Sequence, residues 1–285
     1  MERFRLCAVA AICGALGLLW VPQEARAESN DSGEAVWKQI QALHWEHGPK
    51  NVPALQNATL QLRVRTIFLD TDETDDFLRL TENNPSDVPE QIFAPEDFHW
   101  WASIDFSDDG YVKDQDKIDR DAILNAIKQG TERANEERRR NGWAEMHVVG
   151  WRYPPHYDTA TKRLEWALDV KDSSGLVSTN FQTRLLGRRG VTNVVLVTNP
   201  THLDNDVAEF KSMLAGYRFN PGDNYAEFKQ GDKVAAYGLA ALIVGGGAAV
   251  AAKSGLLKFL GKFIWVGLGA AALFVKRLFK RRDVG

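Results

Sequence analysis

Four apolar or alternating segments lie between residues 146 and 197, and only short turn-forming sequences separate them. Alternation of this kind is typical of β-strands, because successive side chains of a strand point to opposite faces. A parallel connection needs a dozen or more residues, so strands this close together must pair antiparallel. The region therefore predicts an antiparallel sheet built from the segments 146–151, 164–170, 177–183 and 194–197.

Residues 119–140 predict a long helix. Ile123, Ile127 and Ala134 lie on one stripe, acidic residues occupy the first turn and arginines the last, as the helix dipole favours. A second helix is expected after Thr201, with Thr201 as its N-cap and Gly216 at its end. A short amphipathic helix is expected within 28–50.

The remaining pattern predicts two further strands, at 58–69 and 100–106. Asp109-Gly110 indicates a hairpin, with Tyr111 beginning the returning strand. The acidic, proline-containing stretch 70–97 is expected to be a loop or a short helix. We therefore predict an α+β fold, with antiparallel sheets and flanking helices, in one domain over 28–233.

The N-terminus has the pattern of a secretory signal peptide over residues 1–27. A basic start precedes an apolar run from Leu6 to Val21, and Ala25-Arg26-Ala27 has the small-x-small form of a cleavage site. An uncleaved N-terminal anchor is the second interpretation. Both cysteines, Cys7 and Cys13, fall inside this segment, so the mature chain would contain no disulfide and no cysteine metal ligand.

The charges divide the chain into two unlike parts. Residues 28–233 hold 24 basic and 35 acidic residues, a net charge of −11, whereas residues 234–285 hold eight basic residues and a single acid. An acidic domain repels nucleic acid, so no nucleic-acid partner is expected. The basic tail would be attracted to anionic lipid headgroups.

The C-terminal region 234–285 is predicted to be a membrane anchor with a basic tail. Residues 234–252 carry no charge over nineteen residues, and a helix of that length is roughly 28 Å long, close to the apolar thickness of a bilayer. The anchor is expected to be a transmembrane helix or a helical hairpin. The anchor residues are Val234, Tyr237, Leu242, Gly245, Gly246, Gly247, Ala252, Trp265, Lys276, Arg277, Arg281 and Arg282.

Three topologies for this anchor stay open. A single span at 234–252, followed by a basic helix on the cytoplasmic surface, agrees best with the positive-inside rule. A hairpin is the close rival, and a single span at 256–275 would bury Lys258 and Lys262 unless both side chains extend to one interface. All three expect a lipid bilayer as partner and put the main domain on the periplasmic side of a bacterial inner membrane.

The glycine run 245–247, flanked by alanines, could bring two helices close together and support a homo-oligomer or a protein partner. Equally, these small residues could simply make the segment weakly apolar.

One segment carries the candidate chemistry. His147, His156 and Asp158 could form a zinc or acid–base site if they came together. Against this, a histidine in an apolar strand often only bonds backbone, and Pro154-Pro155 forces an extended chain. We therefore expect this segment to contact a ligand, without a catalytic residue, a metal or a cofactor. The expected contact residues are His147, Trp151, His156, Tyr157 and Asp158.

Other candidates are weaker. The carboxylates between 105 and 121 depart from the spacing of a calcium loop, and turn and helix-start positions account for most of them. His44 and His47 are only two potential ligands. The many tryptophans are mostly expected in the core, although exposed ones would suit a peptide or glycan surface.

Several motifs follow one another in a fixed order along the chain. They are Asp109–Asp114, His147–Trp151, Pro154–Asp158, Leu185–Gly190, Arg218–Asn220, Tyr225–Phe228 and Asp232–Gly238. With these motifs, the chain resembles over roughly residues 45–285 the uncharacterised bacterial membrane-anchored proteins of domain-of-unknown-function family 2167. The resemblance implies export and membrane anchoring and brings no established activity. The order of elements is also similar to Mog1/PsbP-like sandwiches, an analogy about fold alone.

Two functions follow from these observations. The first is a non-enzymatic, membrane-tethered binding or interaction module in the bacterial envelope, with an unknown ligand. The alternative is a metal- or carboxylate-dependent envelope enzyme that uses His147, His156 and Asp158. The alternative requires these three side chains to converge in one cleft.

Overall fold

The computed structural model describes residues 34–83, 85, 88–115 and 117–244. A helix over residues 34–42 comes first. The elements that follow are β1 (Glu46–His47), β2 (Lys50–Ala54), β3 (Ala58–Leu62), β4 (Thr66–Leu69), α2 (Thr71–Leu80), β5 (Glu90–Pro95), β6 (Trp101–Ser107), β7 (Tyr111–Lys113), α3 (Arg120–Arg140), β8 (Met146–Asp158), β9 (Arg163–Asp172), β10 (Val177–Leu186), β11 (Val191–Thr198), α4 (Leu203–Leu214), β12 (Tyr217–Phe219), the 3₁₀ helix η1 (Tyr225–Glu227), β13 (Val234–Gly238) and α5 (Leu239–Ile243).

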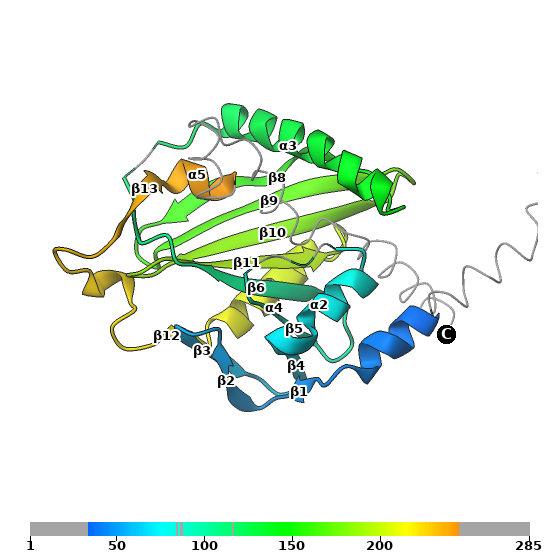
Figure 1. Ribbon diagram of the computed structural model, residues 1–285, viewed down its shortest axis with the longest axis horizontal. Coiled ribbons are helices and arrows are strands. Elements are labelled where there is room, and N and C mark those ends of the chain that lie inside the picture. Colours follow the sequence, from blue (N-terminus) through cyan, green and yellow to red (C-terminus); the bar gives the residue numbers. More distant parts are fainter. Residues whose placement is uncertain (1–33, 84, 86–87, 116, 245–285) are drawn as a thin grey trace, which may run out of the picture.

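The central sheet has eight strands in the order β1-β4-β5-β6-β11-β10-β9-β8 (Figure 1), and every neighbouring pair is antiparallel. Strands β8 to β11 follow one another as successive hairpins. The predicted antiparallel pairing of 146–197 is confirmed, because the short turns allow no other connection. The predicted α+β class with antiparallel sheets and flanking helices is confirmed as well.

One face of this sheet packs against α4 and a small sheet of order β12-β3-β2. Aromatic rings fill the space between these layers. The rings of Phe93 on β5 and Phe210 on α4 stack with their centroids 6.0 Å apart, and Trp100 meets both rings edge-on. The buried residues of this layer form one apolar cluster.

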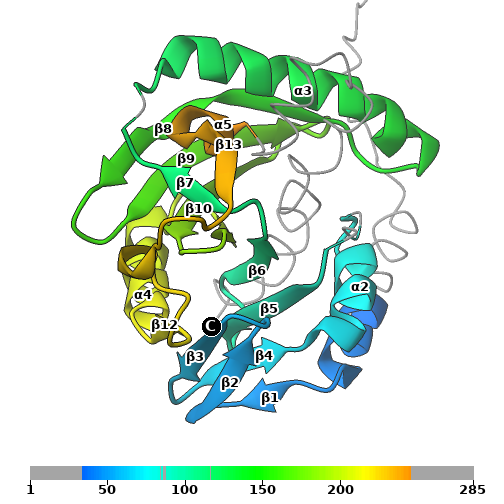
Figure 2. The same cartoon turned by 60° about the vertical axis from the view of Figure 1, so that its left-hand side comes forward.

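The other face is covered at its two ends by different helices. Figure 2 shows α3 and α5 over the end that holds β8 and β9, and α2 over the end that holds β4 and β5. Each end has its own buried apolar cluster, one with α3 and α5 and one with α2 and the helix 34–42. The middle strands β6, β11 and β10 therefore lie between two separate cores on this face.

Helix α3 agrees with its prediction. The side chain of Asp119 accepts a hydrogen bond from the backbone N–H of Ala122 at 3.0 Å, and the helix ends at Arg140. The predicted cap of α4 is wrong. Its N-cap is His202, without a side-chain cap bond, while the Thr201 hydroxyl donates to Asn199 within the preceding turn.

The hairpin predicted at Asp109-Gly110 is wrong, although Gly110 has the positive φ expected of a turn, +96°. Strand β7 does not return along β6, because both edges of β6 are already occupied by β5 and β11. It pairs instead with β13, in parallel, and the hydroxyl of Tyr237 donates to Asp109 beside this pair.

Two N-terminal predictions need correction. The single strand expected at 58–69 is two strands, β3 and β4, because the chain turns at 63–65. The stretch 70–97, expected to be a loop or short helix, contains the helix α2 and also the buried strand β5. Because this stretch is charged and contains prolines, its sequence did not predict β5, which lies within the central sheet.

The expectation that a membrane helix begins at Val234 is wrong. Residues Val234 and Tyr237 belong to strand β13, and Leu242 belongs to the short helix α5. Leu239, Leu242 and Ile243 are buried in the same apolar cluster as α3. The domain therefore extends to about residue 244, beyond the predicted boundary at 233.

Within residues 34–244, no helix is both long and apolar enough to cross a bilayer. The predicted signal peptide 1–27 and the predicted anchor residues from Gly245 onward, including Gly246, Gly247, Ala252, Trp265, Lys276, Arg277, Arg281 and Arg282, lie outside the described residues.

Candidate functional site

The residues predicted to contact a ligand all lie on β8, but they do not meet. His147 is at one end of this strand, and His156 and Asp158 are at the other. The two histidines are nine positions apart along the strand, a distance of roughly 30 Å. The three-residue enzyme site therefore does not form in this structure, because a strand extends its residues in a line.

Four of these five side chains have a local hydrogen bond. His147 Nδ1 lies 2.9 Å from Glu132 Oε1 on α3, and Asp158 accepts hydrogen bonds from Ala160 and Thr161 in its own turn. The Tyr157 hydroxyl donates to Asp114 at 2.9 Å, and the Trp151 indole N–H donates to the Arg120 carbonyl at 3.3 Å. His156 is exposed opposite Glu165 of β9. These contacts are typical of residues that fix the strand to its neighbours.

No group of three or more His, Cys, Asp or Glu side chains in the described part of the chain could hold a metal ion. The carboxylates between 105 and 121 have separate roles, and of the three described here only Asp119 has the helix-start role that the sequence predicted. Asp119 caps α3, Asp114 pairs with Lys162 at 2.9 Å, and Asp105 faces the interior.

A different set of polar residues does come together. They occupy the face of β5, β6, β11 and β10 that lies between the two apolar clusters. We call this set the polar lane. It consists of Glu90, Ser103, Asp105, Asn180, Gln182, Arg184 and Asn193.

The register of the sheet aligns these residues in rows. Glu90 pairs with Asp105, Asp105 with Asn193, and Asn193 with Arg184, so one row crosses four strands. Directly paired residues of an antiparallel sheet point to the same face. Ser103 and Gln182 lie in the next row, through Val195, and Asn180 lies one row further on.

Two buried carboxyl groups lie side by side at the β5–β6 end of the lane. Burial, and to a lesser extent the charge of Asp105, raise the pKa of Glu90 to about 8. The neighbouring Ser103 hydroxyl offsets part of this effect, although it lies outside normal hydrogen-bonding geometry. Burial also raises the pKa of Asp105 to about 6, against the opposing effect of its hydrogen bond from Asn193 at 2.6 Å.

A buried cation lies at the opposite end. Burial lowers the pKa of Arg184 to about 10, and the charge of Asp105 partly counteracts this. The guanidinium lies over the ring of Trp166, 4.8 Å from its centroid, and donates to Gln182 Oε1 at 2.8 Å. At neutral pH the lane therefore presents a guanidinium cation, an ionised Asp105 and a protonated Glu90.

Several buried polar atoms in and beside the lane have no hydrogen-bond partner within the described structure. These include both carboxyl oxygens of Glu90, the Ser103 hydroxyl, both amide atoms of Asn180 and the indole N–H of Trp166. Glu90 is 4% exposed and Asn180 is completely buried. Such atoms are rare in native proteins, and each requires an explanation.

Little in the sequence indicated this site. Glu90 lay in a stretch expected to be a loop. Asn180, Gln182 and Arg184 alternate with apolar residues, a pattern that ordinarily indicates a solvent-facing side. In the structure the polar side of β10 is buried, so the same alternation corresponds here to part of the polar lane.

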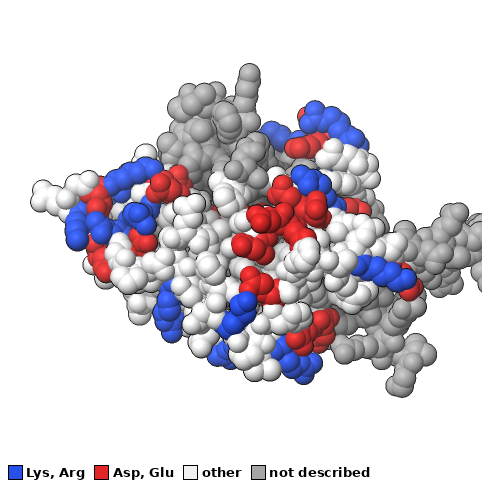
Figure 3. Space-filling view, turned by 60° about the horizontal axis from the view of Figure 1, so that its bottom comes forward, with Lys and Arg blue, Asp and Glu red and all other residues white. Residues whose placement is uncertain are grey.

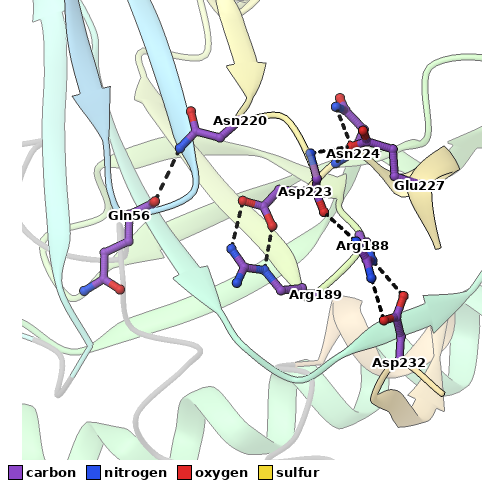
Figure 4. Close-up of polar contacts among 9 residues, drawn as sticks. Gln56, Arg188, Arg189, Asn220, Asp223, Asn224, Glu227 and Asp232 are labelled. Carbon is purple, nitrogen blue, oxygen red and sulfur yellow. Dashed lines mark hydrogen bonds and ion pairs between the residues drawn. The ribbon is translucent and has the colours of Figure 1, made fainter. Parts of the chain in front are cut away.

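The family-like motifs at 185–190, 218–220, 225–228 and 232–238 meet elsewhere, at the turn between β10 and β11 (Figure 4). Arg188 donates two hydrogen bonds, both 2.7 Å long, to the carboxylate of Asp232. Arg189 pairs with Asp223, and Glu227 accepts from Asn224. A side chain at Gly190 would meet the Ser107 carbonyl oxygen at 2.0 Å. This cluster, which we call the arginine clamp (Arg188, Arg189, Asp223 and Asp232), holds the segment before β13 against the sheet.

Charge is unevenly distributed over the surface. Figure 3 shows acidic side chains gathered near the middle of one face. Basic and acidic side chains are interleaved at the left-hand end of the same view, where Figure 1 places the segment between β12 and β13.

Comparisons with known proteins bear on family and fold. No curated protein matches the chain. A solution structure of cyanobacterial PsbP (CyanoP) from Synechocystis sp. PCC 6803 is similar with a TM-score of 0.33 and 12% identity, over 61% of this chain and 98% of that one. A likeness at this score carries no argument about fold or function. A family model described as a protein of unknown function, DUF2167, matches residues 46–276. The chain therefore belongs to the DUF2167 family, as its motifs indicated.

Proposed function

We propose that the protein is a membrane-tethered binding module of the bacterial envelope whose ligand site is the polar lane. The supporting observation is the set of buried polar atoms without partners on one face of β5, β6 and β10. The lane replaces the residues of β8 as the proposed site, because the β8 side chains are spread along a strand and have partners.

The energetics support a ligand. Leaving a buried polar group without a hydrogen bond costs roughly 1–3 kcal/mol. Glu90, Ser103 and Asn180 together would cost several kcal/mol, a large fraction of the typical stability of about 5–15 kcal/mol. A cost of this size is more readily understood where the groups are used for binding, since function commonly retains residues that lower stability.

The proposal is tested by identifying what the native protein carries. The full chain would be extracted from its own membranes in mild detergent, and released small molecules would be measured by mass spectrometry. We expect a small molecule that is present with the unchanged protein and lost with Asn180→Leu. The control Asn125→Leu makes the same change at an exposed position of α3 and should retain it. Identical profiles for all three proteins would contradict the proposal.

For the tether, we propose a single membrane span at 256–275. Strand β13 and α5 belong to the domain, so a span beginning at Val234 is no longer compatible with the fold. A span at 256–275 leaves Trp265 within it and the basic tail Lys276–Arg282 at the cytoplasmic end. Lys258 and Lys262 would then extend toward the outer interface.

The topology is tested by cysteine labelling, because the predicted mature chain has no cysteine of its own. Ser173→Cys places a thiol in an exposed turn of the domain, and Val284→Cys places one in the tail. In intact spheroplasts we expect a membrane-impermeant maleimide to label position 173 and to label position 284 only after lysis. Labelling of position 284 in intact cells would exclude the single span, and protection of both would exclude export of the domain.

A further inference from the structure

We infer that the polar lane binds a small zwitterion, an amino acid, with Arg184 pairing with its carboxylate and Asp105 pairing with its ammonium group. This inference rests on the proposed function and names the ligand class of the same site. It follows from the hydrogen bonds that Arg184 lacks, from the position of Asp105, and from the charge balance of the lane.

Arg184 has far more hydrogen-bonding capacity than it uses. A guanidinium carries five N–H donors. Arg184 gives one to Gln182 Oε1 at 2.8 Å and one, at 3.4 Å, to the carbonyl of its own neighbour Thr183. No carboxylate of the described residues lies within ion-pair distance of it, although the side chain is buried. A buried guanidinium in this state is suited to bind a carboxylate in two parallel hydrogen bonds.

Asp105 is not in ion-pair contact with the Arg184 guanidinium. It lies on β6, with β11 between it and the β10 position of Arg184. Two strand spacings separate their backbones by about 10 Å. The charges influence each other's pKa across that interval, but they do not form an ion pair in contact. Asn193, which donates to Asp105, stands between them.

The Arg184 guanidinium and the Asp105 carboxylate have opposite charges and lie on one face of the sheet. A ligand that carries both a negative and a positive group therefore complements both residues. A plain carboxylate would leave the lane with an excess negative charge close to Asp105, and a plain amine would leave Arg184 without a partner. A molecule that carries a carboxylate at one end and an ammonium group at the other leaves the lane neutral. Glu90, with its raised pKa, adds no second negative charge at neutral pH.

The unpartnered polar atoms lie where such a ligand would be held. Ser103 occupies the row next to that of Asp105 and Arg184, and Asn180 occupies the row beyond it. The guanidinium lies over the ring of Trp166, whose indole N–H has no partner within the described structure. A carboxylate on Arg184 could accept from Trp166, and the amide of Asn180 could both donate and accept.

The test measures binding of defined probes to the full chain in detergent by isothermal titration calorimetry. The zwitterions are glycine, L-alanine, L-serine and 4-aminobutanoate. Each comparison ligand lacks one charge, L-alaninamide without the carboxylate and propanoate without the ammonium group. We expect at least one zwitterion to bind at least tenfold more tightly than either comparison ligand.

Two variants assign the charges. Arg184→Met should remove the preference for L-alanine over L-alaninamide, and Asp105→Asn should remove the preference for L-alanine over propanoate. Arg133→Met changes an exposed arginine of α3 and should leave both preferences intact. Arg184→Lys keeps the charge, and partial binding by it would support the assignment even if Arg184→Met fails to fold.

The outcomes separate this inference from the proposed function. If no zwitterion binds more tightly than propanoate and L-alaninamide, the inference is wrong. If mass spectrometry of the native protein then finds a molecule without opposite charges that is lost with Asn180→Leu, the polar lane remains the binding site. If neither experiment finds a ligand, the zwitterion inference and the proposed binding function of the polar lane are both overturned.

Discussion

At the scale of single residues, the two acidic residues of the polar lane, Glu90 and Asp105, hold protons that the unfolded chain would release. The pKa of Glu90 in the fold is about 8 and that of Asp105 is about 6, both above the ordinary values for their side chains. For a carboxyl group whose pKa is raised by folding, the folded state binds more protons than the unfolded state between the two pKa values. Stability therefore falls as pH rises through this interval, from about pH 4.5 to pH 8 for Glu90.

This relation predicts the effect of Glu90→Gln. At pH 8 the substitution should increase the free energy of unfolding by about 1–4 kcal/mol, because it removes the cost of ionising a buried group. At pH 5 the difference should be much smaller, since Glu90 is then protonated in the fold. Urea unfolding at the two pH values measures the difference. Glu136→Gln, at an exposed position of α3, should change stability little at either pH, and an equal effect of Glu90→Gln at pH 5 and pH 8 would contradict the raised pKa.

His99 is predicted to have the opposite pH dependence. Its Nδ1 lies 2.5 Å from Asp97 Oδ1 and its Nε2 lies 2.9 Å from Glu209 Oε2 on α4. Desolvation lowers its pKa, but the hydrogen bond and charge of Asp97 and the charges of Asp206 and Glu209 outweigh this and raise it overall. The stabilisation is complete below the unfolded pKa of about 6.5 and is lost as pH rises through the higher folded pKa.

Accordingly, His99→Gln should destabilise the protein more at pH 6 than at pH 9. Thermal unfolding followed by tryptophan fluorescence at the two pH values provides the comparison. His147 pairs with a single exposed glutamate, so His147→Gln serves as the matched control with a weaker effect. A loss of stability for His99→Gln that does not depend on pH would show that the ion pairs contribute nothing.

At the scale of elements, α3 is fixed to the sheet by one buried amide. Asn135 donates to the Met146 carbonyl at 2.8 Å and accepts from the Met146 N–H at 2.9 Å. Asn135→Ala leaves both backbone groups without partners, which should cost about 2–4 kcal/mol. The exposed change Asn125→Ala on the same helix should cost less than about 0.5 kcal/mol. Chemical unfolding of both variants measures this, and equal values would mean that the amide does not connect α3 to β8.

The arginine clamp determines how firmly β13 is held. Arg188 and Asp232 form two parallel hydrogen bonds, and the pKa of Asp232 falls to about 2 chiefly because of them. Arg188→Gln should release the segment 229–238 and speed hydrogen exchange of the β13 amides, while exchange in β9 and β10 stays unchanged. If the β13 amides exchange at the same rate in the variant and in the unchanged protein, strand pairing alone holds β13 in place.

At the scale of the whole molecule, the position of the domain boundary has a measurable consequence. A chain that ends at Val244 retains β13 and α5, whereas one that ends at Lys233 loses Leu239, Leu242 and Ile243 from the cluster under α3. Burial of three such side chains contributes several kcal/mol. The chain of residues 28–233 should therefore melt at a clearly lower temperature than that of residues 28–244. Equal melting temperatures would place the boundary back at 233.

How far the sequence predicts this molecule depends on whether a feature is local. The turns at 158–161, 172–175 and 187–190 are local, and they were sufficient to predict the antiparallel pairing of β8 to β11. The caps and charge order of α3 are local too, so its bounds agreed within a residue. The pairing of β7 with β13 joins segments more than a hundred residues apart, and no local pattern could indicate it.

The candidate site shows the same division more sharply. From its own pattern, the sequence determined that the region 146–197 forms strands that pair antiparallel and that one long helix accompanies them, because backbone periodicity and turn chemistry depend on near neighbours. Only the tertiary structure decided that the polar side of β10 is buried, that Glu90 and Arg184 share one row, and that β13 belongs to the domain. These features arise from register and from helices packing on both faces of a sheet, and such contacts join residues that are distant in sequence.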